Sequence, residues 1–172
     1  TLTADVTGCD GNGLNVAGDG ITLDCDSHSI TGLETAYTSG IYVNNSNNII
    51  KNCNVSNFTY GIYVDDSDNN NFLDNVATDN GIGIELYYSN NNTFTGNEVS
   101  LSTSWVAFTL DHSHNNTIEN NTIGPGSDDG LYLGNSSYNT IQNNHVTQFA
   151  TGFEGIGIFL DHNSTYNTVY NN

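Results

Sequence analysis

The chain has 172 residues, with 19 acidic side chains and a single basic one, Lys51, which gives a formal net charge of -18. Without arginine the chain has no bidentate clamp for phosphate or carboxylate groups, so nucleic acid is excluded as a partner, and anionic membranes and polyanionic substrates are disfavoured. No apolar run approaches the roughly 18 residues that a membrane span requires.

Asparagine is unusually frequent, at 30 residues, but 35% of the chain is still apolar. The apolar residues recur in a fixed rhythm, which argues against disorder. The length suits one domain of ordinary size. We therefore expect a single folded domain over residues 1–172, with a first coil and edge at 1–32 and repeats at 33–172.

The rhythm comes from a repeated motif of a small residue, an apolar residue, a variable residue and a second apolar residue. Its copies are Gly20–Leu23, Gly40–Val43, Gly61–Val64, Gly83–Leu86, Ala107–Leu110, Gly130–Leu133 and Gly157–Leu160. Each copy has the period-2 pattern of a short half-buried strand. An asparagine-rich turn follows, and then a second apolar pair: Ile50/Val55, Phe72/Val76, Phe94/Val99, Ile118/Ile123 or Ile141/Val146.

A repeat this short cannot bury a core alone, but it can stack on its neighbours. Two or three short strands per repeat, with no helical periodicity, predict an all-β parallel β-helix of about seven to eight coils, each rising about 4.8 Å. Asparagine tolerates the left-handed backbone of tight corners and can hydrogen-bond from coil to coil. This explains the asparagine excess structurally.

The segment from Gly20 to Gly32, followed by repeats of Gly-Ile-Tyr-Val-x-x-Ser-x-Asn-Asn, resembles the NosD-type right-handed parallel β-helix repeat. The resemblance covers nearly the whole chain. It implies a right-handed β-helix, in agreement with the bias of parallel crossovers, and a secreted or cell-surface location. It is specific for the fold and weak for function, because the repeat occurs in proteins of several roles.

The three cysteines are too few for a disulfide scaffold. Cys9 and Cys25 flank the first coil, where a bridge would staple its start, and we predict them as the candidate disulfide. Cys53 alternates with apolar residues and is interpreted as a buried thiol.

Paired carboxylates on neighbouring turns offer oxygen ligands of the kind that calcium prefers. The candidate calcium residues are Asp24, Asp26, Asp65, Asp66, Asp68 and Asp111. The glycine- and aspartate-rich nonapeptide of dedicated calcium β-rolls is absent. Calcium is therefore an optional ligand, and no cofactor is required. His112 and His162 share a phase but lie two coils apart, too far to share one ion.

Extra residues enter the repeat at one phase only, at Ser100–Val106, Gly124–Asp129 and Thr147–Gly155. Equivalent corners of successive coils stack, so these loops should form one edge of the rod. Aromatic and acidic side chains on this edge are typical of sugar binding. The candidate glycan-binding residues are Trp105, Asp128, Asp129, Phe149, Phe153 and Glu154. Alternatively, the aromatic residues fold inward and cap the loops.

A second candidate surface is the middle residue of each strand motif, which should point outward. This column reads Thr22, Tyr42, Tyr63, Glu85, Thr109, Tyr132 and Phe159, and its aromatic rings could contact glycans or another rod. Tyrosine is also simply favoured on strands. Eight N-glycosylation sequons lie at Asn44, Asn54, Asn57, Asn91, Asn115, Asn120, Asn135 and Asn163, close to the number that chance gives in this composition.

The favoured function is a non-enzymatic extracellular structural β-solenoid, either a module of a surface protein or a fibre subunit. The chain stops in mid-repeat at Thr168–Asn172 without a polar cap, which predicts further repeats or head-to-tail stacking with another copy. The alternative is a carbohydrate-binding or carbohydrate-processing β-helix using the edge around Trp105 and Glu154. A polyuronate lyase is disfavoured because Lys51 stands alone, whereas a glycoside hydrolase would need only two carboxylates.

Overall fold

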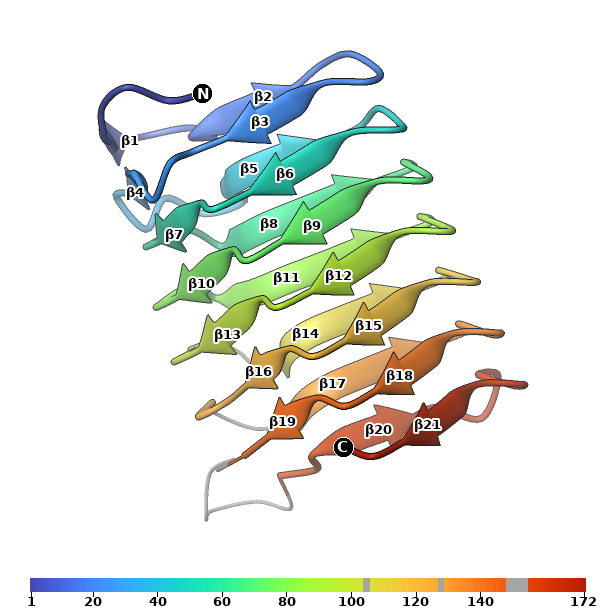
Figure 1. The fold of residues 1–172 in the computed structure, drawn as a ribbon. Coiled ribbons are helices and arrows are strands. Elements are labelled where there is room, and N and C mark those ends of the chain that lie inside the picture. The colour runs from blue at the N-terminus through green and yellow to red at the C-terminus, as the bar shows by residue number, and fades with distance from the viewer. Residues whose placement is uncertain (104–105, 127–128, 148–154) are drawn as a thin grey trace.

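The computed structural model describes residues 1–103, 106–126, 129–147 and 155–172. The described chain winds into a right-handed parallel β-helix of three sheets, each with seven strands, so every coil contributes one strand to each sheet (Figure 1). This confirms the predicted fold class. Among the described residues there is no helix long and apolar enough to cross a membrane.

We name the sheets A, B and C in the order in which each coil visits them. Sheet A contains β1 (Val6–Cys9), β4 (Ser29–Gly32), β7 (Asn54–Ser56), β10 (Val76–Thr78), β13 (Glu98–Ser100), β16 (Thr122–Ile123) and β19 (His145–Val146). Sheet B contains β2 (Leu14–Val16), β5 (Ser39–Val43), β8 (Tyr60–Asp65), β11 (Ile82–Tyr87), β14 (Val106–Asp111), β17 (Asp129–Gly134) and β20 (Ile158–Leu160). Sheet C contains β3 (Thr22–Asp24), β6 (Ile49–Lys51), β9 (Asn71–Leu73), β12 (Thr93–Thr95), β15 (Thr117–Glu119), β18 (Thr140–Gln142) and β21 (Thr168–Tyr170).

The core is a set of in-register apolar columns, one or two from each sheet. Ile50, Phe72, Phe94, Ile118 and Ile141 form the column of sheet C, and all five are fully buried. Phe72 and Phe94 stack with ring centroids 4.3 Å apart. Sheet B adds two columns, which include Ile62 and Val64. Because each coil buries its apolar side chains against the next, the core runs the length of the rod.

Asparagine ladders join the coils at two corners. At the corner between sheets C and A, the Asn97 Oδ1 atom accepts hydrogen bonds from the backbone N–H and the side-chain amide of Asn75, both at 3.0 Å. The Asn97 side-chain amide donates to the Phe72 carbonyl and to Asn121 Oδ1, each at 3.0 Å. A second ladder at the corner between B and C contains Asn48, Asn70, Asn92, Asn116, Asn139 and Asn167. These bonds satisfy backbone groups that a sharp corner would otherwise bury unpaired.

The small residue near the start of most sheet B strands lies against the next coil. A Cβ atom added to Gly61 would collide with the Gly83 carbonyl oxygen. The requirement for a small residue therefore arises from the close approach of backbones, and Ala107 is the largest side chain at the equivalent position of the seven coils.

Two predicted registers are wrong. Gly20–Leu23 is not a copy of the sheet B motif, because Thr22 and Leu23 lie in sheet C opposite Ile49 and Ile50. The sheet B strand of the first coil is β2, where Asn15 pairs with Tyr42. The predicted apolar pair Phe72/Val76 is also out of register by one residue. The inward-facing residue is Ala77 rather than Val76, because Ala77 pairs with the inward-facing Val55 and Val99.

The predicted Cys9–Cys25 bridge is also wrong. Cys25 and Cys53 form the disulfide, with Cα atoms 4.8 Å apart, and Cys9 is a free thiol. Both cysteines of the bridge occupy the corner between sheets C and A, in adjacent coils, and Cys53 N–H donates to Asn75 Oδ1 at 3.1 Å. The bridge thus takes the place of one rung of the asparagine ladder. Cys53 is buried as predicted, but not as a thiol.

Candidate functional site

The described parts of the loops that were predicted to form one edge, which include residues 100–103 and 124–126, lie at one corner, between sheets A and B. Trp105, Asp128, Phe149, Phe153 and Glu154 fall outside the described residues, so the glycan role of this edge stays a prediction. Asp129 is described. It begins β17, and its Oδ1 atom accepts a hydrogen bond from Ile156 N–H at 2.9 Å, so its carboxylate holds the chain that enters the last coil.

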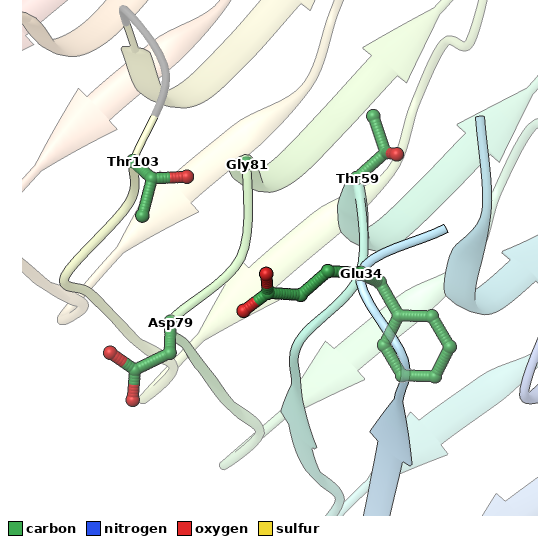
Figure 2. A pocket seen from close by; sticks show the side chains of 6 residues that line it. Glu34, Thr59, Asp79, Gly81 and Thr103 are labelled. Carbon is green, nitrogen blue, oxygen red and sulfur yellow. The ribbon is translucent and has the colours of Figure 1, made fainter. Parts of the chain in front are cut away.

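A pocket of about 400 Å³ opens at the same corner, between the longer connections after β4 and β13 (Figure 2). It is lined by Glu34, Phe58, Thr59, Asp79, Gly81 and Thr103. Figure 2 shows the Glu34 side chain reaching across the pocket toward the side that carries Asp79. The sequence analysis did not identify Glu34 or Asp79 as candidate site residues. They line one pocket only because the corners of successive coils stack and the two coils between the longer connections turn this corner with short connections.

The outer surface of sheet B carries the densest group of aromatic side chains among the described residues. We call it the tyrosine face and define it as Tyr42, Tyr60, Tyr63, Glu85, Tyr87, Thr109, Tyr132 and Phe159. The predicted outward column is confirmed from Tyr42 to Phe159. Each of these middle residues lies between two inward-facing apolar residues, as Glu85 lies between Ile84 and Leu86.

The rings of this face contact one another. Tyr60 and Tyr63 stack with centroids 5.0 Å apart, and Tyr63 lies 5.8 Å from Tyr42. Tyr132 and Phe159 form a second pair at 5.5 Å. The two groups are separated by Glu85 and Thr109, which occupy the same column. The face therefore has two aromatic platforms with a polar gap between them. Because Thr59 and Gly81 directly precede β8 and β11, the pocket adjoins the first platform.

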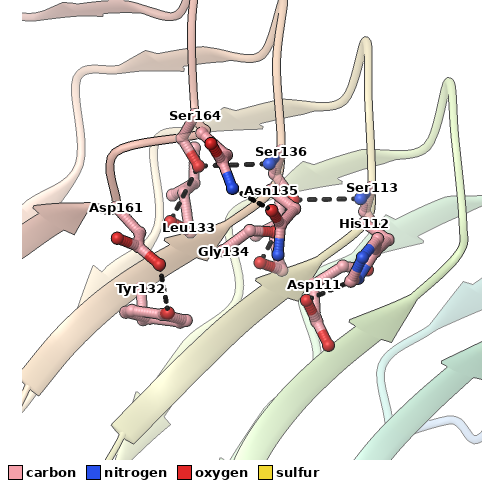
Figure 3. A network of polar contacts seen from close by, with 12 residues as sticks. Asp111, His112, Ser113, Tyr132, Leu133, Gly134, Asn135, Ser136, Asp161 and Ser164 are labelled. Carbon is pink, nitrogen blue, oxygen red and sulfur yellow. Dashed lines mark hydrogen bonds and ion pairs between the residues drawn. The ribbon is translucent and has the colours of Figure 1, made fainter.

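Acidic residues follow the strand ends of the tyrosine face. Asp65 and Asp111 both pair with Tyr87, one on each side, and Asp161 lies two coils beyond Asp111. The Tyr42 hydroxyl donates to Asp65 at 2.8 Å and the Tyr132 hydroxyl to Asp161 at 3.3 Å. Figure 3 shows the Tyr132–Asp161 contact beside the corner between sheets B and C. At this corner the backbone N–H groups of Ser113 and Ser136 donate to the side-chain oxygens of Ser136 and Ser164, respectively. These bonds fix the tyrosine hydroxyls toward one side of the face.

Glu85 is the most perturbed carboxyl of this surface. Burial is the main reason that its pKa rises to about 7, and the negative charges of Asp111 and Asp65 raise it further. Burial also raises the pKa of Tyr63, with added contributions from the charges of Asp65 and Glu85. A carboxyl group with a pKa near neutrality exchanges its proton in the physiological range, which is a common property of functional sites.

The structure does not gather the calcium candidates. Asp24 and Asp26 lie at the end of β3 in sheet C, whereas Asp65, Asp66, Asp68 and Asp111 lie at the far ends of sheet B strands and their corners. Asp24 is already engaged: it accepts from Asn52 at 3.1 Å and pairs with Lys51 at 3.0 Å. The hydrogen bond from Asn52 is the main cause of a pKa lowered to about 2. In the described part of the chain, no group of three or more His, Cys, Asp or Glu could hold a metal ion.

All eight sequon asparagines retain exposed surface, and several lie at corner tips with a left-handed backbone, including Asn91, Asn115 and Asn120. Their use remains a prediction.

Residues 3–172 match the model of a family described as the periplasmic copper-binding protein NosD. The chain belongs to the NosD family. The periplasmic description of the family agrees with the predicted location outside the cytoplasm. Comparison with curated protein sequences finds no match.

Three solved structures share the fold of this NosD-family chain. Two are periplasmic alginate epimerase AlgG: a threonine-to-asparagine mutant (TM-score 0.72, 20% identity, 87% of this chain and 36% of the other) and a second AlgG structure (TM-score 0.67, 17% identity, 95% and 44%). The third is tailspike protein 2 of a bacteriophage of Escherichia coli O157:H7 (TM-score 0.66, 12% identity, 92% and 23%). At these identities the likeness shows the fold alone. The chain spans less than half the length of each.

The residues present do not fit the copper that the family description names. Copper favours several imidazoles, or thiolate and thioether ligands, and the chain has no methionine. The histidines are dispersed: His28 contacts Asp5, His112 contacts Asp111, and His114 accepts a hydrogen bond from Ser137 N–H. With no cluster of three candidate ligands in the described residues, we assign no copper chemistry to this chain.

Proposed function

We propose that this NosD-family chain is a glycan-binding β-helix that acts outside the cytoplasm, and that the glycan lies along the tyrosine face. The observation that carries the proposal is the platform of Tyr42, Tyr60 and Tyr63, whose rings contact one another on the outer surface of sheet B. Aromatic faces bordered by fixed polar groups are suited to sugars, which offer an apolar C–H face and hydroxyl groups around it.

The charge of the chain limits the kind of glycan. The fold neighbour AlgG is named an alginate epimerase, and alginate is a polyanion. This chain has one basic residue, Lys51, and it pairs with Asp24 on sheet C. Asp65, Glu85 and Asp111 would repel the carboxylates of a uronate polymer on the tyrosine face. The proposed ligand is therefore a neutral or amine-bearing glycan.

The test is isothermal titration calorimetry with cellohexaose, the hexamer of N-acetylglucosamine, the hexamer of glucosamine, and an alginate oligomer. We expect binding to at least one of the first three and none to alginate. Tyr63→Ala should weaken binding by roughly tenfold, because it removes the ring at the centre of the platform and so about 1.4 kcal/mol of contact.

The matched control is Tyr138→Ala. Tyr138 is 58% exposed and stacks on Tyr166 at 5.0 Å, at a corner outside the tyrosine face. Equal loss of binding in the two variants, or no binding to any of the first three oligomers, would contradict the proposal.

The structural role, with end-to-end stacking, is a second proposal. It is supported by the last described coil, where Val169 and Tyr170 of β21 are 41% and 44% exposed at an unpaired strand edge. Further repeats of a longer chain would cover the same edge. Sedimentation velocity over a range of concentrations tests it, since a stacking rod forms a ladder of oligomers and an isolated rod does not.

A further inference from the structure

The polar gap of the tyrosine face is an electrostatically unbalanced position. Glu85 lies in register between Tyr63 and Thr109, and Asp65 and Asp111 lie diagonally beside it at the strand ends. Diagonal neighbours on one face of a sheet are close enough to interact. Among the described residues, no lysine forms an ion pair with these three carboxyl groups, because Lys51 pairs with Asp24 on sheet C. Of these three carboxyl groups, His112 contacts only Asp111, at 2.8 Å.

A second and independent observation lies next to Glu85. Thr109 is 9% exposed, and its Oγ1 atom is buried without a hydrogen-bond partner in the described structure. Phe108 and Leu110 on either side point into the core, so the Thr109 side chain projects into the gap beside Glu85. A buried hydroxyl without a partner is uncommon, because leaving it unpaired costs about 1–3 kcal/mol. The gap thus contains the Thr109 hydroxyl, which has no hydrogen-bond partner in the described structure, beside the Glu85 carboxyl, which has no lysine near it.

The chemistry of the gap favours an ammonium group over a metal ion. The carboxyls do not form a group that could hold a metal, whereas an ammonium bonds through N–H donors of longer reach and needs only one close carboxylate and one hydroxyl. Tyr63 and Tyr87 are neighbours of Glu85 on the sheet, and aromatic rings also attract a cation. The raised pKa of Glu85, caused first by burial and then by the charges of Asp111 and Asp65, agrees with a carboxyl group that has no cation beside it.

We propose that Glu85 and Thr109 form a subsite for the protonated amine of an amino-sugar residue, held between the two aromatic platforms. This inference rests on the proposed glycan function and specifies its ligand as a glycan with free amino groups. The Glu85 carboxylate would accept one N–H bond, the Thr109 hydroxyl a second, and the Tyr63 ring would stack against the sugar.

The first experiment compares the glucosamine hexamer with its N-acetylated form, which keeps the ring but carries no charge. We expect the wild-type chain to prefer the free amine by at least tenfold. Glu85→Gln should abolish that preference, because the amide has no negative charge to attract the ammonium group. Glu98→Gln is the matched control, because Glu98 is an exposed carboxylate on sheet A and its loss changes the net charge equally. Equal effects of the two variants would show general attraction to an acidic protein and overturn the subsite.

Thr109→Val removes the hydroxyl with little change in shape and none in charge. It should reduce the preference for the amine several-fold and leave the folded state intact, since the hydroxyl has no internal partner. An unchanged preference would remove Thr109 from the subsite.

A second readout separates failure of the subsite from failure of the glycan proposal. Carboxyl ¹³C NMR of glutamate-labelled protein follows Glu85 directly as monomeric glucosamine is added. Glucosamine should lower the titration midpoint of Glu85, and N-acetylglucosamine should not. The absence of that shift overturns the subsite even where the hexamers bind the platform. An equal shift with a simple lysine amide would show a cation site without sugar selectivity and would also overturn the proposal.

Discussion

The corner between sheets C and A and the outer face of sheet B are both columns of stacked residues, but only one of them repeats. The corner carries Asn75, Asn97, Asn121, Asn144 and Asn172 in successive coils. The outer column changes from Asn15 to Tyr42, Tyr63, Glu85, Thr109, Tyr132 and Phe159. A buried amide must match the groups of the coils before and after it, so identical residues recur. The outer column meets solvent, where a departure from the repeat is not needed for folding and points to function.

The largest expected effect tests the repeating column. Asn97→Ala would remove the acceptor of both Asn75 bonds and the donor to the Phe72 carbonyl, and would leave the Asn75 backbone N–H and the Phe72 carbonyl buried without these partners. We expect a loss of about 3–5 kcal/mol in the free energy of unfolding, measured by urea denaturation. Asn115→Gly is the control, because Asn115 is an exposed corner residue with a left-handed backbone that glycine adopts freely. Similar losses in both variants would show that the loss in Asn97→Ala does not come from its ladder hydrogen bonds.

A smaller effect is expected at the Cys25–Cys53 disulfide, which takes the place of asparagine in the repeating column. Replacing both bridge cysteines, as in Cys25→Ala with Cys53→Ala, should reduce stability by about 2–4 kcal/mol. Cys25→Asn with Cys53→Asn should recover part of this loss, because Cys53 N–H already donates to the ladder through Asn75. Urea denaturation with and without reductant measures both variants, and reductant should affect only the wild-type chain. If the asparagine pair were no better than the alanine pair, the rung would not be interchangeable with the ladder.

The Cys25–Cys53 disulfide also shows how much of the fold could be predicted from the sequence. Periodicity predicted two or three stacked strands per coil, most of their inward residues and the structural role of asparagine. The first coil was misaligned because Gly20–Leu23 carries the same small-apolar pattern as the sheet B strands, while the true equivalent, β2, begins after Gly13. The disulfide was predicted from the position of Cys9 and Cys25 at either side of the first coil, whereas Cys25 shares its corner with Cys53 in the next coil.

The candidate site was only partly predictable, for a different reason. Alternation along each strand placed Tyr63, Glu85 and Thr109 in one outward column, and the structure confirms it. The raised pKa of Glu85 depends on Asp65 and Asp111, which are 20 and 26 residues away in the chain and become neighbours only through the stacking of coils. The unpaired hydroxyl of Thr109 depends on which groups fail to reach it, and no sequence pattern encodes that.

The smallest expected effect is the change in stability with pH that Glu85 causes in the varying outer column. The pKa of Glu85 is about 7 in the folded chain against an ordinary value of 4.5, so the folded state holds this proton more tightly than the unfolded chain does. The contribution to stability is complete below about pH 4.5 and is lost as the pH rises through 7. For a partly exposed group we expect the loss to be about 1–2 kcal/mol.

Glu85→Gln keeps the shape of the side chain and has no charge to bury. Its free energy of unfolding should match that of the wild-type chain near pH 4.5 and exceed it at pH 8, when both are measured by urea denaturation in the same buffers. Glu98→Gln, at an exposed position of sheet A, should follow the wild-type profile. Parallel profiles for the wild type and Glu85→Gln would show that Glu85 ionises as freely as a surface carboxylate. The tyrosine face would then lack the electrostatic imbalance that distinguishes it from the repeating corner, and the ammonium subsite would rest on geometry alone.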